Sequence, residues 1–372
     1  MFSKFKTADI WLLLLPLFLA GLGIAVIYSI TLTSTGASLA IRQFVSVILG
    51  LIIYFFFTFI DYRAIRSWAW PFFVLTLCSL LLVRIFGQTT FGSQRWIDFG
   101  FFQFQPSELA KLAVIFVLAT LFTNRVKRIH SRRLFMGILL TLIPVFMVLT
   151  QPDLGSAIVL SLTGFSVMVA AGISKKQWLG FIIFGLVMAL AAVLAWNNVT
   201  PFKGLVKDYQ RERVITFINP DLDPSGAGYN VLQAVIAVGS GGISGTGLGF
   251  GSQSQLNFLP VAHTDFIFAS IAESWGFVGS VFVLILYGLL IGRIINAATI
   301  AKDDFSMLLC SGIAAMMLIQ LIINVGMNLQ LLPVTGITLP LISFGGSSML
   351  TVMAALGIVQ SVVVRYKRIT FY

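Results

Sequence analysis

The chain has 372 residues, of which 58% are hydrophobic and only 10% charged, and its mean hydropathy is +0.99. Soluble proteins carry roughly 25% charged residues, so these values exclude a water-soluble globule and a disordered chain. Cys78 and Cys310 both lie in apolar stretches, which argues against a disulfide framework and a cluster of metal-ligating cysteines. The net charge of +11 comes from short basic clusters between apolar stretches, a pattern that does not favour a nucleic acid as partner.

Uncharged apolar stretches predict an all-α polytopic membrane protein, because about 20 apolar residues cross a bilayer as one helix. The uncharged run 305–364 is too long for one helix, and the turn-forming stretch 333–346 divides it. About ten transmembrane helices are expected, and residues 1–372 are expected to form a single integral membrane domain. In chain order the predicted helices are 10–30, 42–60, 69–86, 106–123, 134–150, 154–172, 178–196, 265–292, 306–330 and 346–364.

Two long loops stand out between the predicted helices, 87–105 and 197–264. The second joins predicted helices seven and eight, and a loop of that length in a compact protein is usually functional. Within it, residues 229–238 are apolar but too few to span a bilayer, which predicts a re-entrant or interfacial segment.

Lysine and arginine set the expected orientation, because they are enriched in cytoplasmic segments. With the N-terminus inside, 16 of the 24 basic residues lie in inner segments and 7 in outer ones, and Lys111 lies within a span. Both termini are therefore expected in the cytoplasm, with an uncleaved first span. Nine of the 13 acidic residues then lie outside or within the membrane, so the chemistry is expected on the outer face.

Several charged residues lie in or next to predicted spans, where an ionisable group needs a partner or a wet cavity. Glu108 and Lys111 are three residues apart and so share a helix face. They form either a structural ion pair or part of a cavity for an anionic headgroup. Asp153 either neutralises Lys111 or caps the helix that follows it.

Asp265 is the strongest candidate for a catalytic group. It follows His263 and Thr264 at the outer mouth of a predicted span, where partial desolvation raises the pKa of a carboxylate toward that of a general base. A simple helix cap is the alternative. Glu273, two turns deeper, is either a second cavity carboxylate or a helix-packing contact.

Arginines in the two loops offer forked hydrogen bonds for a phosphate. Arg211 and Arg213 either clamp such a group or face solvent and lipid headgroups, and Arg95 poses the same choice. The glycine-rich stretch 239–249 lacks the context of a nucleotide-binding loop. No set of histidines, cysteines and carboxylates has zinc-site spacing.

Taken together, the motifs resemble the SEDS family of RodA/FtsW/SpoVE-type proteins over nearly the whole chain. Each motif is short, but their joint order is specific to that family. They read GSQRWI at 92–97, QPSELAK at 105–111, QPDLG at 151–155, GAGY at 226–229, SGG at 240–242, HTDFIF at 263–268, PVTG at 333–336 and SFGGSS at 343–348. Short termini make the chain look more like the elongation branch (RodA) than the division branch (FtsW).

The resemblance implies a peptidoglycan polymerase of the bacterial cytoplasmic membrane that uses lipid II and releases polyprenyl pyrophosphate. The essential loop aspartate of the family corresponds to Asp265. An α-linked donor and a β-linked product require one inverting displacement, which needs a base and charge stabilisation of the leaving group. The residues expected to contact substrate are Arg95, Glu108, Lys111, Asp153, Arg211, Arg213, His263, Thr264 and Glu273.

The resemblance further implies that lipid II and the growing glycan strand bind, that a class B penicillin-binding protein and elongation-complex membrane proteins are partners, and that a divalent cation such as Mg²⁺ or Mn²⁺ assists. Two other functions remain open from the residues alone. Glu108, Lys111 and Asp153 would line the path of a flippase for lipid-linked precursors. A non-catalytic scaffold would only activate a transpeptidase.

Overall fold

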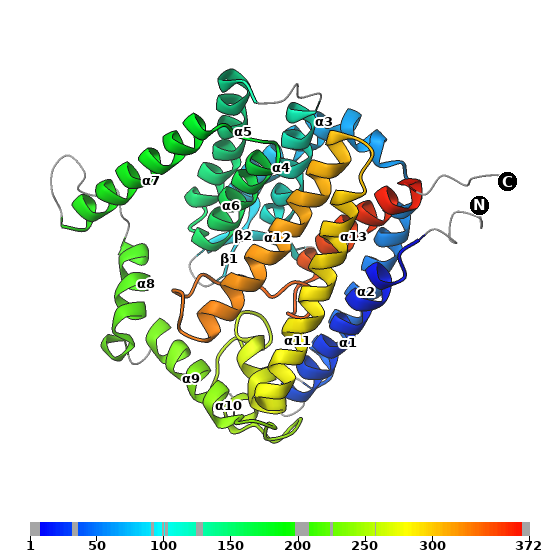
Figure 1. Cartoon of the computed structure of the whole chain (residues 1–372). Helices are drawn as coiled ribbons and strands as arrows, with labels where there is room; N and C mark the ends of the chain where they lie inside the picture. The colour runs from blue at the N-terminus through cyan, green and yellow to red at the C-terminus, as the bar shows by residue number, and fades with distance from the viewer. Residues whose placement is uncertain are drawn as a thin grey trace.

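The computed structural model describes residues 8–31, 36–90, 93–98, 100, 103–123, 129–197, 208–223, 226–256 and 258–366. Long helices form a bundle, and a small sheet and short helices lie at one end of it (Figure 1). The long helices are α1 (Trp11–Thr31), α2 (Ser38–Phe59), α3 (Tyr62–Phe86), α4 (Pro106–Phe122), α5 (Ser131–Thr150), α6 (Leu154–Ala170), α7 (Lys175–Trp196), α11 (Ile267–Thr299), α12 (Asp304–Asn328) and α13 (Gly346–Tyr366).

These ten helices match the ten predicted from the sequence, which confirms the polytopic all-α fold. Within the described part of the chain, eight of them are long and apolar enough to cross a membrane, and α4 and α6 are shorter at 17 residues each. A capping side chain explains why the third helix begins earlier than predicted. The third helix begins at Tyr62 rather than at 69, because the Asp61 carboxylate accepts a hydrogen bond from the Arg63 N–H at 2.9 Å.

Helix α4 lies at the centre of the bundle, and most of its residues are buried against α3, α5, α6, α12 and α13. Close approach depends on small residues. A β-carbon added at Gly312 of α12 would lie 2.8 Å from Val167 and 2.9 Å from Ile115, and one at Gly357 of α13 would lie 2.4 Å from the Tyr54 carbonyl oxygen. Spans pack through such small residues because lipid supplies no hydrophobic force between helices.

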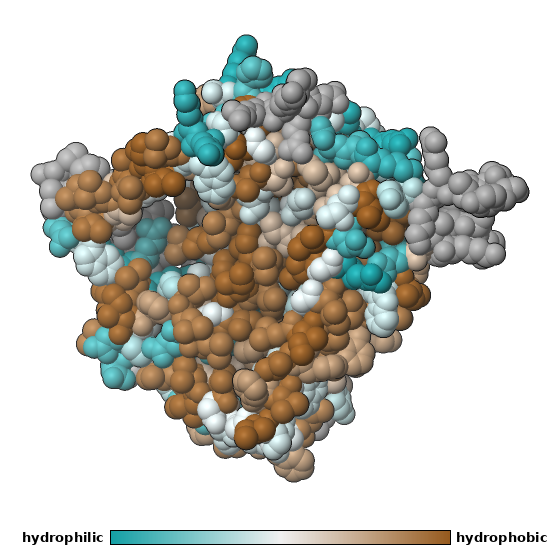
Figure 2. Space-filling model, in the orientation of Figure 1, coloured by the Kyte–Doolittle hydropathy of each residue, from teal (hydrophilic) through white to brown (hydrophobic). Residues whose placement is uncertain are grey.

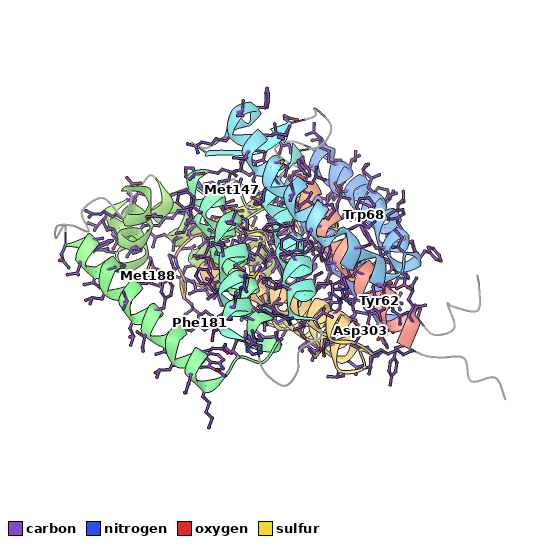
Figure 3. The ribbon with its side chains drawn as sticks, turned by 90° about the horizontal axis from the view of Figure 1, so that it is seen from above. Tyr62, Trp68, Met147, Phe181, Met188 and Asp303 are labelled. Carbon is purple, nitrogen blue, oxygen red and sulfur yellow. The ribbon has the colours of Figure 1, made fainter. Side chains whose placement is uncertain are left out.

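Helix α7 stands apart from the bundle (Figures 1 and 3). The structure describes all of α7, and Ala195 is its one buried residue. Its contact with the bundle includes Phe181, whose ring centroid lies 5.0 Å from that of Phe165 on α6. A broad apolar surface crosses the middle of the molecule, and polar side chains gather at the upper end in the view of Figure 2.

The two ends of the bundle differ in their connections. Segments 60–61, 171–174 and 300–303 are short and lie at one end, where Tyr62 of α3 donates a hydrogen bond to Asp303 at 2.7 Å (Figure 3). The opposite end, here called the Asp265 end, carries the described parts of the longer segments 87–105, 197–266 and 329–345. Basic residues of the orientation argument that lie outside the described residues are Lys4, Lys6, Arg125, Lys127, Arg128, Lys203, Lys207, Lys367 and Arg368.

Both predicted loops contain regular structure. The first forms a three-stranded antiparallel sheet of β1 (Gln88–Thr90), β2 (Ser93–Asp98) and β3 (Gln103–Phe104), with Ile97 opposite Phe104. The second contains α8 (Asp208–Ile218), the 3₁₀ helix η2 (Pro220–Leu222), α9 (Ala227–Ser240) and α10 (Ser252–Gln255). The apolar segment 229–238 thus lies within helix α9, and Val231, Ala234 and Ala237 of this segment are buried.

Helix α11 is broken at Gly276, where φ is 65° and ψ is −162°. Backbone N–H groups freed by the break are satisfied by the glycine-rich loop that follows α9. Phe277 donates to the Gly242 carbonyl at 2.9 Å, and Val278 donates to the Ile243 carbonyl at 3.1 Å. The break separates the first turns of α11, which follow Asp265, from its longer second part.

Substituting Gly276 by alanine tests this arrangement. The backbone region at Gly276 is almost restricted to glycine, and an added β-carbon would lie 2.4 Å from the Gly245 nitrogen. We expect Gly276→Ala to lower the free energy of unfolding by about 2 kcal/mol or more. The matched control is Gly288→Ala on the same helix, where an added β-carbon meets nothing within 4 Å. Thermal unfolding in detergent measures both, and equal stability of the two variants would refute the role of the break.

Candidate functional site

Asp265 lies just before the first residue of α11, in the turn 258–266. Its carboxylate faces Gly336 of the segment 329–345, because a β-carbon added at Gly336 would lie 3.4 Å from Oδ2. Gly336 has a φ of 71°, so this position suits glycine for its backbone as well as its size. The Asp265 side chain is enclosed by protein yet keeps a partly exposed surface. It is therefore both desolvated and reachable.

Two asparagines of α12 fix the backbone of Asp265. The side-chain amides of Asn324 and Asn328 donate to the Asp265 carbonyl oxygen at 2.9 and 3.1 Å. The Asn328 side-chain oxygen also accepts from the N–H of Ala269, one turn into α11, at 3.0 Å. Sequence reasoning missed these residues, although two asparagines four apart in an otherwise apolar span are a recognisable signal.

The residues before Asp265 are bound to the segment 329–345. The Ser343 hydroxyl donates to the Thr264 carbonyl at 2.6 Å, and the Phe344 N–H donates to the His263 carbonyl at 2.8 Å. The ring of Phe344 also packs edge-on against His263, with centroids 5.8 Å apart. Gln43 of α2 holds the other side of that segment by donating to the Ser343 carbonyl at 3.1 Å.

Three charged residues surround this turn. The Asp153 carboxylate caps α6 by accepting from the N–H of Ser156 at 3.0 Å, and it forms an ion pair with Arg95 of β2 at 3.6 Å. Arg95 also donates to the Pro152 carbonyl, and its Nε has no hydrogen-bond partner among the described residues. Arg213 of α8 donates to the Val334 carbonyl at 3.0 Å. Asp153 therefore both caps the helix and pairs with a cation, and that cation is Arg95 rather than Lys111.

Burial sets the protonation of Asp265. Desolvation raises the pKa of its carboxyl group to about 6, although hydrogen bonding by Thr264 and the charges of Arg95 and Arg213 oppose the rise. The negative charge of Asp153 adds to the rise. Burial lowers the pKa of His263, so that its imidazole is neutral at pH 7. Near neutral pH the site thus combines an ionised carboxylate of raised basicity with two guanidinium groups.

Arg211 and Arg213 are not brought together as one clamp. They are two apart on α8, and residues at that spacing point to different sides of a helix. Arg211 donates to the Ala195 carbonyl at 2.8 Å, and its guanidinium lies 5.9 Å from the centroid of the Trp196 ring. Arg211 therefore holds the end of α7, whereas Arg213 lies beside the Asp265 turn.

Glu108 and Lys111 form a buried ion pair of 2.7 Å within α4. Both side chains are nearly inaccessible, at 7% and 3% exposure. The Glu108 Oε2 atom has no hydrogen-bond partner among the described residues. This geometry favours the structural ion pair over a headgroup cavity, and the role of the pair in binding substrate stays a prediction.

Glu273 lies in the first part of α11 and is fully buried. Its two carboxylate oxygens accept from the N–H groups of Gln253 and Ser254 at 2.8 and 3.1 Å, and the Ser254 hydroxyl adds a bond of 2.5 Å. Glu273 thus binds the first turn of α10, ten residues before Asp265. These contacts favour the packing alternative.

A divalent cation would need acidic or histidine ligands close to Asp265. Among the described residues, no three or more histidine, cysteine, aspartate and glutamate side chains are close enough to hold a metal ion. The protein side chains described here therefore do not fit a preformed metal cage, and the divalent cation stays a prediction.

The raised pKa of Asp265 predicts how stability depends on pH. An acid with a higher pKa in the folded than in the unfolded state destabilises the fold as pH rises from its unfolded value of 3.8 through about 6. Asp265→Asn removes that cost. We expect its gain in unfolding free energy over wild type to be about 2 kcal/mol larger at about pH 8 than at about pH 4. Thermal unfolding at both pH values measures it, and a gain that does not change with pH would contradict the desolvation argument.

A double substitution tests the buried ion pair. Lys111→Met leaves the Glu108 carboxylate buried and unpaired, so we expect a loss of about 3–5 kcal/mol in unfolding free energy. Adding Glu108→Gln removes the stranded charge and is expected to restore most of that loss. Lys176→Met, at an exposed position of α7, is the control and should have little effect. A double variant as unstable as Lys111→Met alone would show that Lys111 serves something other than Glu108.

Comparison with known proteins gives concordant results. A family model described as cell cycle protein, FTSW_RODA_SPOVE, matches residues 8–368. The peptidoglycan glycosyltransferase MrdB of Escherichia coli (strain K12) is 38% identical over 321 residues, which cover 86% of this chain and 84% of MrdB. The rod shape determining protein RodA of Thermus thermophilus is 30% identical in its crystal structure, with a TM-score of 0.69 and 96% of each chain covered.

A further solved structure superimposes more closely. It is described as "Structural coordination of polymerization and crosslinking by a peptidoglycan synthase complex", with a TM-score of 0.80, 33% identity, and 96% of this chain and 98% of that chain covered. The family match extends over nearly all of the sequence, and the motifs that resemble SEDS proteins fall within it. The chain therefore belongs to the FtsW/RodA/SpoVE family, the SEDS proteins.

Proposed function

We propose that this protein is a peptidoglycan glycosyltransferase that polymerises glycan strands from lipid II during cell elongation, with Asp265 as its general base. The observation that carries the proposal is the partly accessible Asp265 carboxylate, whose pKa is raised to about 6 beside Arg95 and Arg213. A carboxylate with that pKa is ionised at neutral pH, so it can accept a proton, and it is more basic than an ordinary carboxylate. The names of the related proteins support the same activity.

The proposed step is one inverting displacement. Asp265 takes the proton from the acceptor sugar hydroxyl as the hydroxyl oxygen forms a bond to the anomeric carbon of the donor. The bond from that carbon to the pyrophosphate oxygen breaks, its electron pair goes to that oxygen, and polyprenyl pyrophosphate leaves. Arg95 and Arg213 stabilise the charge that develops on the leaving group. Arg95 has an Nε–H without a partner among the described residues, so it has a donor to offer.

The proposal places the Asp265 end on the outer face of the bacterial cytoplasmic membrane, with both chain termini in the cytoplasm. The opposite end carries Arg63, Arg66, Arg132, Arg133, Lys175, Lys176, Arg293, Lys302 and Arg365 among its described residues, which accords with the rule that cytoplasmic segments are positively charged. A class B penicillin-binding protein is proposed as partner, supported by the likeness to a synthase complex that coordinates polymerisation and crosslinking.

The test is polymerisation of purified lipid II, with the partner transpeptidase supplied. We expect Asp265→Asn to abolish polymer, since the amide cannot accept the proton, and wild-type activity to rise with pH through about 6. The matched control is Asp98→Asn in β2, which is exposed and accepts a hydrogen bond from the nearby Gly100 N–H, a bond that asparagine can also accept. Equal polymer from wild type and Asp265→Asn would remove Asp265 from the mechanism, and no polymer from wild type would overturn the proposed activity.

A further inference from the structure

Helix α7 leaves a space between itself and the rest of the bundle. Residues 182–190 of α7 are all exposed, and nine consecutive helical residues cover every side of a helix. The side of α7 that faces α5 and α6 is therefore as open as its outer side. Figure 2 shows the surface hollowed between α7 and the bundle, and Figure 3 shows Met188 of α7 across this space from Met147 of α5. This space is here called the α7 gap.

The walls of the α7 gap are apolar. Phe165 of α6 faces α7, since its ring centroid lies 5.0 Å from that of Phe181 and 5.6 Å from that of Trp178. Leu162, which lies one turn from Phe165 on the same face of α6, is exposed. The sequence from 177 to 196 contains no charged residue. Inside a membrane, a space with such walls is filled by hydrocarbon, because these side chains offer no partner to an ion.

Basic side chains border the α7 gap at the end of the bundle opposite the Asp265 end. The Gln177 side-chain amide donates to the Ile129 carbonyl at 2.9 Å, which joins the start of α7 to the residues just before α5. Each of these two helices begins with a pair of adjacent, exposed basic residues. This group, here called the basic rim, consists of Arg132 and Arg133 on α5 and Lys175 and Lys176 on α7. None of the four forms an ion pair with another described residue.

Acidic residues are scarce in the sequence around the basic rim. From 109 to 207 the sequence contains one acidic residue, Asp153, which caps α6 at the Asp265 end. Elsewhere at the same end of the bundle as the rim, arginines are paired. Arg293 binds Asp9 at 3.2 Å, and Arg365 binds Asp61 at 3.5 Å. The charge of the basic rim is therefore available for an external anion.

We infer that the basic rim and the α7 gap together bind an anionic phospholipid of the surrounding membrane. The phosphate lies at the basic rim, which supplies charge-assisted hydrogen bonds, and an acyl chain lies in the gap. The lengths agree. One leaflet contains about 15 Å of hydrocarbon, and about ten residues of helix, from Lys176 to Leu186, span that distance. Basic pockets between spans are typical sites for anionic headgroups. The inference does not depend on the proposed function.

The two parts of the site identify the ligand only in combination. An apolar helix of another protein would fill the gap without using the charge of the rim. A free phosphate ion would use that charge without filling the gap. An anionic phospholipid has both a phosphate and hydrocarbon chains, and it is already present in the bilayer where the gap opens.

Lipid binding to the full-length protein in an uncharged detergent tests the inference. Native mass spectrometry measures the dissociation constants of dioleoyl phosphatidylglycerol and dioleoyl phosphatidylcholine, which share their chains and differ in net charge. We expect wild type to bind phosphatidylglycerol about tenfold more tightly. A variant without most of the rim should bind both lipids equally, and it carries Arg132→Gln, Arg133→Gln and Lys175→Gln. Equal binding of the two lipids to wild type would overturn the inference.

A control variant separates the rim from net charge. Three exposed arginines outside the rim are replaced, as Arg42→Gln, Arg66→Gln and Arg84→Gln. This control loses the same charge as the rim variant and should keep the wild-type preference for phosphatidylglycerol. Thermal unfolding without added lipid should be the same for both variants and wild type, since all the replaced side chains are exposed. A preference that survives in the rim variant, or is lost equally in the control, would overturn the inference.

Crosslinking locates the acyl chain. Phosphatidylglycerol with a photoreactive acyl chain, added to the protein in phosphatidylcholine nanodiscs, should label peptides of α5, α6 and α7. We expect severalfold less labelling of these peptides in the rim variant. An excess of glycerol 3-phosphate should leave the labelling unchanged, because it has the phosphate without the chains. Displacement of the probe by glycerol 3-phosphate, or equal labelling of these peptides in wild type and the rim variant, would overturn the inference.

Discussion

The need to satisfy backbone hydrogen bonds away from water governs the Asp265 end of this bundle. Two non-helical segments, 258–266 and 329–345, lie among apolar spans, where an unpaired N–H or C=O group is costly. Polar side chains from neighbouring spans meet the need, namely Asn324, Asn328 and Gln43. These same hydrogen bonds fix the turn that carries Asp265. A rigid site within the membrane protein is therefore a result of satisfying its irregular backbone.

The buried charges fall into two groups by what they contact. Glu108, Lys111 and Glu273 bind groups inside the protein: Glu108 and Lys111 pair within α4, and Glu273 joins α11 to α10. Asp265 instead faces Gly336, is partly accessible, and has guanidinium groups nearby. A general base needs a desolvated carboxylate that a ligand can reach, whereas a carboxylate that is buried and bound to internal groups has a structural role.

Much of this arrangement could be predicted from the sequence, because long apolar stretches can only be spans and a lone carboxylate at the mouth of one is conspicuous. Asp265 and the ten helices follow from that reasoning. The sheet was not predictable, since its strands have two to six residues and no clear alternation. Arg211 and Arg213 point to different sides because α8 is a helix. The mixed polar sequence of α8 does not predict that helix. Contacts such as Asn324 with the Asp265 carbonyl join residues 59 apart and need the fold itself.

The break in α11 determines which contacts set the direction of the segment that follows Asp265. Because α11 is interrupted at Gly276, the direction of its first part, residues 267–275, is not fixed by the direction of its longer second part. The direction of residues 267–275 is set by lateral contacts: the peptide groups of Gly242 and Ile243 at the break, the turn of α10 held on Glu273, and Asn328 of α12, which bonds the Ala269 N–H. A change in the length or composition of the loop 241–247 would therefore change the direction of residues 267–275. The Asp265 carboxylate, which precedes them, would move as well, while the second part of α11, after Gly276, kept its place in the bilayer.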